Sequence, residues 1–391
     1  MSARTPTPWP PRAPALGPRP DEPPALSTPR RLQRMGAVTV GVSLPREWVG
    51  QRGLTPGHSV FLRTLPDGSL ILRDSERTHE PTSVVLEVPA NEPGEHLFRR
   101  LIGAYLAGAT EFVIRQPGGL TGETRGIARS FARRTGHTES VSEEGAKLIL
   151  RDVSTGAVVP VPRLLRRMFQ MVFDLQVEAG TAWLAGSTVS PAGLSARDDE
   201  VDRYAWQIER GLRRSPWEAA SPSDPEVGDP FRSLLWARDL ERIGDHAVLL
   251  GEHGTRLAEA GPPDSLRRML STYHAQALEH LKAAHAVALS PDAVRANELL
   301  DVGDALHETE GAIADRILLR ETTDRLAPAA IRSLGLVLQS IDRTTGYAQN
   351  LAEIGLDRDL ERVTRSGPRH PSTLASSFEP TGIPATPPPT P

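Results

Sequence analysis

The 391-residue sequence predicts a multidomain protein with a small β-rich domain, a small α/β domain and an all-α body of two repeated three-helix units. Three observations support this fold class. Short apolar runs separated by Gly, Pro and Asp predict the β-rich domain. Alternating strand-length and helix-length segments predict the α/β domain, and apolar residues that recur at spacings of three and four predict the helical body. The expected boundaries are 28–76 for the β-rich domain, 82–158 for the α/β connector, and 160–258 and 264–358 for the two repeats, flanked by Pro-rich tails predicted to be disordered at 1–27 and 366–391.

The second half of the chain carries the helical pattern. The turns between the predicted helices contain Pro or Asp, which suit the first positions of a helix. The acidic segments recur at nearly equal intervals, because 39 residues separate Asp202 from Glu241 and 38 separate Asp304 from Asp342. A duplicated three-helix unit explains both intervals. The expected helices span 162–186, 198–215, 230–254, 265–290, 292–320 and 328–355.

Acidic residues on these helices are candidates for cation binding. Glu241 and Asp245 are four residues apart, which places both carboxylates on one helix face. Carboxylates suit hard cations such as Mg²⁺, Ca²⁺ or Mn²⁺, and His246 and His307 could add nitrogen ligands. The alternative is that these acids are solvated helix-face charges or partners of nearby arginines, of which Arg238, Arg242 and Arg343 are examples.

The segment from Leu240 to Ala247, the opening Leu165–Phe169 and the twofold three-helix pattern resemble the PhoU family of phosphate-signalling regulators over roughly residues 160–358. The resemblance implies that Glu/Asp-x-x-x-Asp motifs bind iron or another metal, with manganese, magnesium and zinc as further candidates. The candidate metal ligands are Asp199, Asp202, Glu241, Asp245, Asp301, Asp304 and Asp342. Gly346 replaces the last carboxylate of the second motif, so we expect that copy to bind metal more weakly.

The β-rich domain is expected to contain strands at 38–44, 59–64 and 69–73 and a short helix from Pro45, with Asp67-Gly68 as a hairpin turn. The run from Gly41 to Val49, followed by Gly53-Leu54-x-Pro56-Gly57, resembles the SpoVT/AbrB swapped-hairpin DNA-binding domain, which precedes the PhoU body in archaeal members of that family. The resemblance implies a homodimer in which two copies interleave their strands.

Charge agrees with a DNA partner for this domain. Residues 28–74 contain seven Arg and three acidic residues, a local charge of about +4 in a chain whose net charge is −4. The candidates for phosphate or base contact are Arg31, Arg34, Arg46 and Arg52. The alternative is that these arginines only keep the domain soluble or tether it to the acidic helices.

The connector has the order β-α-β-α-β-β, which suits a small α/β sandwich. Its Gly118-Gly119-Leu120-Thr121-Gly122 segment could cradle a phosphate on helix amides, but it lacks the Lys-Ser/Thr of a P-loop, so an ordinary loop and helix cap is favoured. No apolar run approaches a membrane span, no targeting signal is evident, and Cys is absent; we therefore expect a cytoplasmic protein without disulfides.

These expectations combine into a dimeric, metal-binding, DNA-binding regulator of phosphate homeostasis. The alternative is a protein-binding module acting on a phosphate transporter or its signalling partner, with the β-rich domain serving mainly for dimerisation. A metal-dependent hydrolase is disfavoured, because no nucleophile and base pair can be picked out and PhoU-like proteins are not enzymes.

Overall fold

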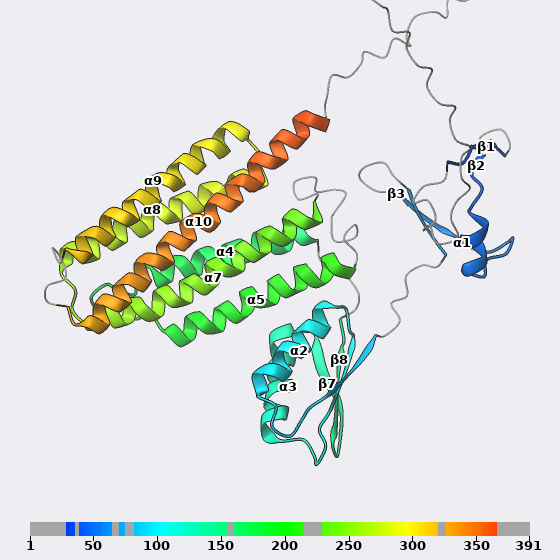
Figure 1. Cartoon of the computed structure of the whole chain (residues 1–391), viewed down its shortest axis with the longest axis horizontal. Coiled ribbons are helices and arrows are strands. Elements are labelled where there is room, and N and C mark those ends of the chain that lie inside the picture. The colour runs from blue at the N-terminus through cyan, green and yellow to red at the C-terminus, as the bar shows by residue number, and fades with distance from the viewer. Residues whose placement is uncertain are drawn as a thin grey trace, which may run out of the picture. The chain divides into compact units, whose positions relative to one another are not determined.

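The computed structural model describes residues 29–35, 39–64, 70–74, 82–154, 160–214, 229–319 and 326–365. The chain divides into two compact units, Met1–Thr78 and His79–Pro391. The predicted tails at 1–27 and 366–391 and the Asp67-Gly68 turn lie outside the described residues. Figure 1 labels most of the elements of both units.

The described residues of the first unit form two small antiparallel strand pairs and one short helix. Strand β1 (Gln33–Arg34) pairs with β2 (Val40–Gly41), and β3 (Phe61–Thr64) pairs with β4 (Leu70–Arg73), with Phe61 opposite Arg73. Helix α1 (Arg46–Gln51) begins after Pro45, as expected. The first expected strand is much shorter than 38–44 in the described residues, and the swapped-hairpin fold stays a prediction.

None of the described residues of this first unit is buried. Several large apolar side chains are open to solvent, among them Leu32 at 73% exposure and Met35 at 67%. The others are Val40, Val42, Phe61, Leu62 and Leu70. A domain of this size buries little surface even when well packed, so these side chains indicate an incomplete core.

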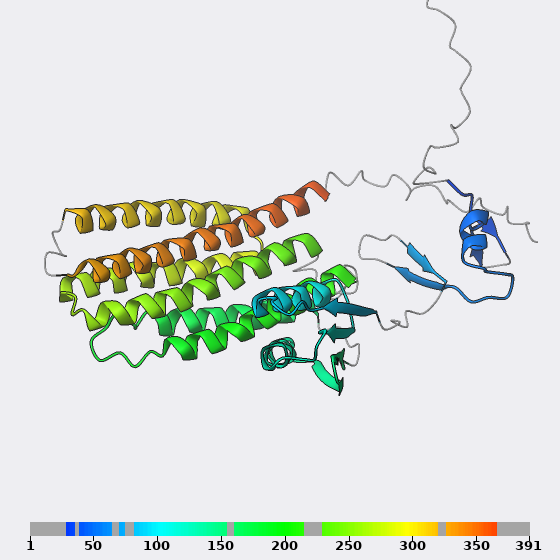
Figure 2. The same cartoon turned by 60° about the horizontal axis from the view of Figure 1, so that its bottom comes forward.

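The second unit begins with the α/β connector, whose predicted element order is confirmed. Strands β5 (Ser83–Glu87), β6 (Glu111–Arg115), β7 (Thr138–Glu144) and β8 (Lys147–Asp152) form one sheet in the order β5-β6-β8-β7, in which only β5 and β6 run parallel. Helices α2 (Gly94–Leu106) and α3 (Gly122–Thr135) lie on one face of it (Figure 2). Phe112 and Phe131 meet edge-on in the core between them.

The glycine-rich loop before α3 is a loop and cap. The Thr121 hydroxyl accepts a hydrogen bond from the Thr124 amide, and the Thr121 amide donates to Gln116 Oε1 at 2.9 Å. Because protein groups already satisfy these amides at the start of the helix, the phosphate-cradle reading loses its main support.

The rest of the unit is a bundle of long helices, seen side by side in Figures 1 and 2. They are α4 (Val161–Ala179), α5 (Pro191–Arg214), α7 (Pro230–Glu259), α8 (Asp264–Leu289), α9 (Ala293–Leu318) and α10 (Pro328–Arg365). Helix α10 packs against α7, α8 and α9, and α7 packs against α4 and α5. Asp229 and Asp292 cap the starts of α7 and α9 through their carboxylates.

One apolar core runs through all six helices. Trp183 and Trp236 are its largest fully buried side chains. Each expected helix is present, and the duplication of the three-helix unit stays a prediction. Within the described residues, none of the helices has an apolar stretch of the length that crossing a bilayer requires.

Candidate functional site

The first acidic cluster lies where α5 crosses α7. Gly244 of α7 makes the approach possible, because a Cβ atom there would lie 2.6 Å from Asp198 Oδ1 of α5. This contact brings the acids of both helices together: Asp198, Asp199, Asp202, Glu241 and Asp245. Sequence reasoning named four of them and missed Asp198.

Asp198 is the most perturbed acid of the cluster. Burial, followed by repulsion from Asp202, Asp245, Glu241 and Asp199, raises its pKa to about 8. Its Oδ1 atom is buried without a hydrogen-bond partner, and the same is true of Glu241 Oε2. Burial also raises the pKa of Glu241, and Asp245 adds to that shift. Buried carboxylate oxygens that lack partners are costly unless a cation or proton satisfies them.

Asp199 and Asp202 already hold a cation that comes from the connector. Arg134 of α3 places Nη2 2.9 Å from Asp199 Oδ1 and forms an ion pair with Asp202. Its guanidinium also lies over the rings of Phe98 and Trp206, at 5.2 and 5.1 Å from their centroids. Burial raises the pKa of Asp202 even though the charge of Arg134 acts in the opposite direction.

The other edge of the cluster opens into a depression of about 600 Å³. Arg242 on this edge contacts Asp245 at 3.0 Å and Glu241 at 3.4 Å. His246 is also part of the lining, and its Nδ1 atom is buried without a partner. Burial lowers the pKa of His246, so the imidazole is neutral at pH 7 and able to act as a ligand. Arg343 and Tyr347 reach the same depression from α10.

Among the described residues, no three His, Asp or Glu side chains are grouped as a metal ion would require. The chemistry of the donor set nevertheless suits a hard cation, because Asp198 Oδ1 is buried without a hydrogen-bond partner and Glu241 and Asp245 add carboxylates beside it. Asp202 and Asp199 are paired with Arg134 instead.

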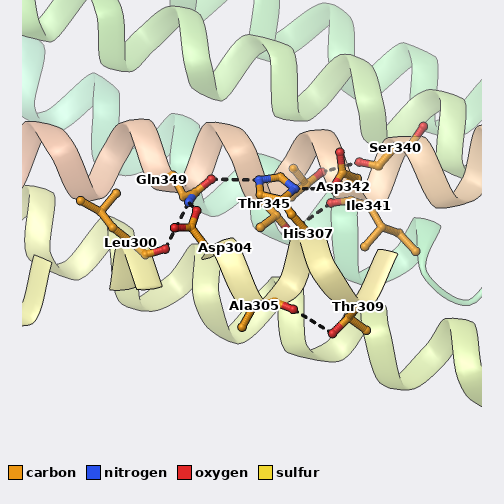
Figure 3. Close-up of polar contacts among 11 residues, drawn as sticks. Leu300, Asp304, Ala305, His307, Thr309, Ser340, Ile341, Asp342, Thr345 and Gln349 are labelled. Atoms are coloured by element: carbon orange, nitrogen blue, oxygen red, sulfur yellow. Dashed lines mark hydrogen bonds and ion pairs between the residues drawn. The ribbon is translucent and has the colours of Figure 1, made fainter. Parts of the chain in front are cut away.

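The second acidic position has a different arrangement, shown in Figure 3. His307 of α9 forms an ion pair with Asp342 through Nδ1, and its Nε2 lies 2.9 Å from Gln349 Oε1. Gln349 Nε2 donates to Asp304 Oδ1 at 3.0 Å and to the Leu300 carbonyl at 3.2 Å. Both ring nitrogens of His307 therefore face acceptors, which an imidazolium satisfies.

The charge of His307 follows from these contacts. Burial lowers its pKa, but the hydrogen bonds to Asp342 and Gln349 outweigh burial and raise the pKa overall. Gly346 faces the ring, and a Cβ atom at Gly346 would lie 4.0 Å from His307 Cε1, an ordinary contact distance. Asp301 is exposed and takes no part in this network. Asp342 and, through Gln349, Asp304 are thus joined to His307 by hydrogen bonds.

The four predicted DNA-contacting arginines are all exposed in the first unit. Arg31 and Arg34 lie before and within β1, and Arg46 and Arg52 lie at the two ends of α1. Arg52 Nη1 is 3.5 Å from Asp74 Oδ2. Their contact with DNA stays a prediction.

A sequence signal for Asp198 exists. The buried stripe of α5 consists of Leu194, Val201, Ala205 and Ile208. Asp198 falls within this stripe, four residues after Leu194 and three before Val201. An acid at a position where the helical period requires an apolar residue marks a buried carboxylate.

Comparison with known families adds an observation that the geometry alone does not supply. Residues 165–253 match the PhoU domain. The PhoU domain begins in α4 and ends in α7, so it contains the whole first acidic cluster and none of the second. Among solved structures, PhoU from Pseudomonas aeruginosa is similar at 18% sequence identity over 51% of this chain and 96% of that chain, with a TM-score of 0.45. No curated protein matches the sequence.

Proposed function

We propose that the protein is a non-enzymatic, cytoplasmic regulator of phosphate uptake and phosphate homeostasis. The match of residues 165–253 to the PhoU domain carries this proposal. The matched segment includes Glu241-x-x-x-Asp245, the acidic motif that the sequence resemblance associates with metal binding.

The acidic cluster of α5 and α7 is the proposed metal site. Asp198, Glu241 and Asp245 would hold a divalent cation, with His246 at the edge as a nitrogen donor. A bound cation would offset the burial and the mutual repulsion that raise the pKa of Asp198, and it would satisfy the Asp198 oxygen that lacks a hydrogen-bond partner. Because oxygen donors dominate and Cys is absent, manganese, magnesium or iron fit better than zinc.

The second cluster is a weaker candidate for metal. Its three predicted acids are Asp301, Asp304 and Asp342. A cation there would have to displace His307 from Asp342 and break the hydrogen bond between Gln349 and Asp304. We therefore propose one principal metal site in each chain.

The first unit would bind DNA as a homodimer. The seven exposed apolar side chains described above support this, because a second copy that interleaves its strands would cover them. The dimer would then present two symmetric sets of Arg31, Arg34, Arg46 and Arg52, whose positive charge suits a phosphate backbone.

Gel-shift measurements test the regulatory reading. Wild-type protein should bind a preferred duplex, and the triple variant Arg31→Ala/Arg34→Ala/Arg46→Ala should lose that binding. Arg129→Ala removes an exposed arginine from α3 of the second unit and serves as the control. Arg-independent binding, or none with sequence preference, would reject a DNA-binding role.

A second candidate function is a protein-binding module for phosphate-transport components. Exposed apolar side chains along α9 and at its end favour it, with Val294 at 72%, Val302 at 45%, Leu318 at 78% and Leu319 at 71% exposure. Under this reading the first unit serves for dimerisation, and the triple Arg variant keeps full regulatory activity in cells.

A further inference from the structure

The connector sheet has one strand edge that is open in the part of the chain that the structure describes. We propose that this edge, strand β5, pairs antiparallel with β5 of a second copy of the chain, so that the two four-stranded sheets join across a twofold axis at Val85. The proposal adds a second interface to the homodimer proposed above, and it does not depend on metal binding or DNA binding.

The main chain of β5 uses one side for β6 and directs the other side outward. Its place at the end of the order β5-β6-β8-β7 makes it an edge strand. The Thr82 carbonyl, just before the strand, accepts a hydrogen bond from the Glu111 amide of β6 at 3.2 Å. Because the main-chain direction alternates from residue to residue, the N–H and C=O groups of Ser83, Val85 and Glu87 point away from β6.

Antiparallel pairing about Val85 uses these outward groups. Opposite residues of an antiparallel pair can exchange two N–H···O=C hydrogen bonds, and Val85 would do so with its counterpart in the second copy. Arg100 already donates to the Glu87 carbonyl through both Nη atoms at 3.1 Å. The Glu87 amide remains available, and in this register it lies opposite the Ser83 carbonyl of the second copy. The strand therefore already presents the groups that the register requires.

The charges on the strand favour the same register. The alternate residues Val84 and Leu86 pack in the core with α2 and α3, so the side chain of Glu87 lies on the open face of the sheet. A twofold axis at Val85 places each Glu87 opposite a serine, whereas an axis at Glu87 would place two carboxylates opposite each other. Arg115 of β6 also lies 3.6 Å from Glu87, so this charge is already compensated within its own sheet.

A row of apolar side chains crosses the open face of the sheet and ends at this edge. The register places Val85 beside Val113, and Val113 beside Ile149. Val113 is only 6% exposed, whereas Val85 at the end of the row is 48% exposed. In the joined sheet the two Val85 side chains would be neighbours on one face, and the apolar row would continue into the second copy.

The opposite edge of the sheet carries features that prevent such pairing. Strand β7 contains a bulge between Ser140 and Ser142, and its sequence TESVSEE is rich in glutamate. Bulges and charges are common means by which edge strands avoid pairing with other chains. Strand β5, with the sequence SVVLE, has a regular register with β6 and a single charge. The contrast between the two edges assigns the interface to β5.

The length of chain before β5 favours a second copy as the partner. Eight residues separate Asp74, which follows β4, from Ser83. A fully extended chain of this length spans on the order of 30 Å. In the homodimer proposed for the first unit, these short connections would keep the two β5 edges close together and raise their effective concentration. A contact between two five-residue strands can then form although it is weak by itself.

Disulfide cross-linking of the full chain tests the register, because the native sequence contains no Cys. Opposite residues of such a pair have Cα atoms about 5.5 Å apart, which a disulfide can bridge. Val141→Cys on β7 is the matched control, because Val141 is also 48% exposed. Mild oxidation should produce covalent dimer about tenfold faster from Val85→Cys than from Val141→Cys. Equal rates from the two variants would overturn the β5 pairing.

Sedimentation equilibrium of the full chain tests whether the contact stabilises the dimer. Val85→Arg places two like charges opposite each other at the axis and should raise the dimer dissociation constant about tenfold. Val141→Arg adds the same charge at the other edge and should leave the constant unchanged. A dimer that Val85→Arg does not weaken would overturn the β5 contact and leave the first-unit homodimer in place. A wild-type chain that stays monomeric would reject both interfaces.

Discussion

The buried ion pair between Arg210 and Asp152 should be the strongest single tie between the connector and the helical body. Its side chains are only 6% and 4% exposed. Replacing Arg210 with Met leaves the Asp152 carboxylate buried and unpaired, and such truncations cost about 3–5 kcal/mol of unfolding free energy. Arg210 also donates to the Tyr105 carbonyl, whose lost partner adds about 1 kcal/mol.

The double variant Arg210→Met/Asp152→Leu separates charge burial from packing. Because it removes both charges, it should recover most of the loss and fall within about 2 kcal/mol of wild type. Guanidinium denaturation followed by circular dichroism at 222 nm measures each value. Arg125→Met breaks the exposed pair with Glu143, with 38% and 42% exposure, and should cost less than about 1 kcal/mol.

Two outcomes would refute this reasoning. A loss below about 1 kcal/mol for Arg210→Met would show that the pair is solvated in solution. If the double variant loses as much unfolding free energy as Arg210→Met and Asp152→Leu lose together, lost packing and not an unpaired charge causes the loss.

Three further predictions concern the bundle. Gly355→Ala should lower the free energy of unfolding, measured by thermal denaturation, by about 1–3 kcal/mol, because its Cβ would lie 2.8 Å from the Val287 carbonyl oxygen. The control Gly335→Ala lies on the same helix, where the added Cβ meets nothing within 4 Å, and should raise the free energy of unfolding by about 0.5–1 kcal/mol. Burial lowers the pKa of His280 from 6.5 to about 4, so the unfolded chain takes up a proton first and the folding free energy is lost as pH falls from 6.5 to 4. His280→Leu should reduce this loss and stabilise the protein by about 1–2 kcal/mol at pH 5, because both ring nitrogens of His280 are buried without hydrogen-bond partners. A pH profile of stability unchanged from wild type would contradict this prediction. Gly346→Asp should add a second, weaker Mn²⁺ equivalent in calorimetry, and a stoichiometry unchanged from wild type would show that His307 keeps the metal out.

The sequence predicts which segments are helical more accurately than it predicts where each helix ends. Caps such as Asp229 and Asp292 are local signals, and the helices they begin were correctly predicted. The predicted stops at Gly186, Gly254 and Gly355 were wrong. Gly254 and Gly355 lie inside α7 and α10, where they allow close packing against Ala182 and Val287. A glycine that permits close helix contact and one that ends a helix look alike in a single sequence.

The acidic cluster was predicted only in part, for a related reason. The four-residue spacing of Glu241 and Asp245 is a property of one helix and was visible in the sequence. The partner of Asp202 depends on how α3 packs against α5, which no local pattern encodes. His307 likewise meets Asp342 across two helices, 35 residues apart. Tertiary contacts of this kind decide whether an acid binds a metal or an internal cation.

Anomalous scattering from crystals grown with Mn²⁺ tests the central claim most directly, namely that the α5–α7 acids form a cation site. The account predicts one strong peak within coordination distance of Asp198, Glu241 and Asp245. A map with no peak at this cluster, in crystals where Mn²⁺ appears elsewhere on the protein, would contradict it.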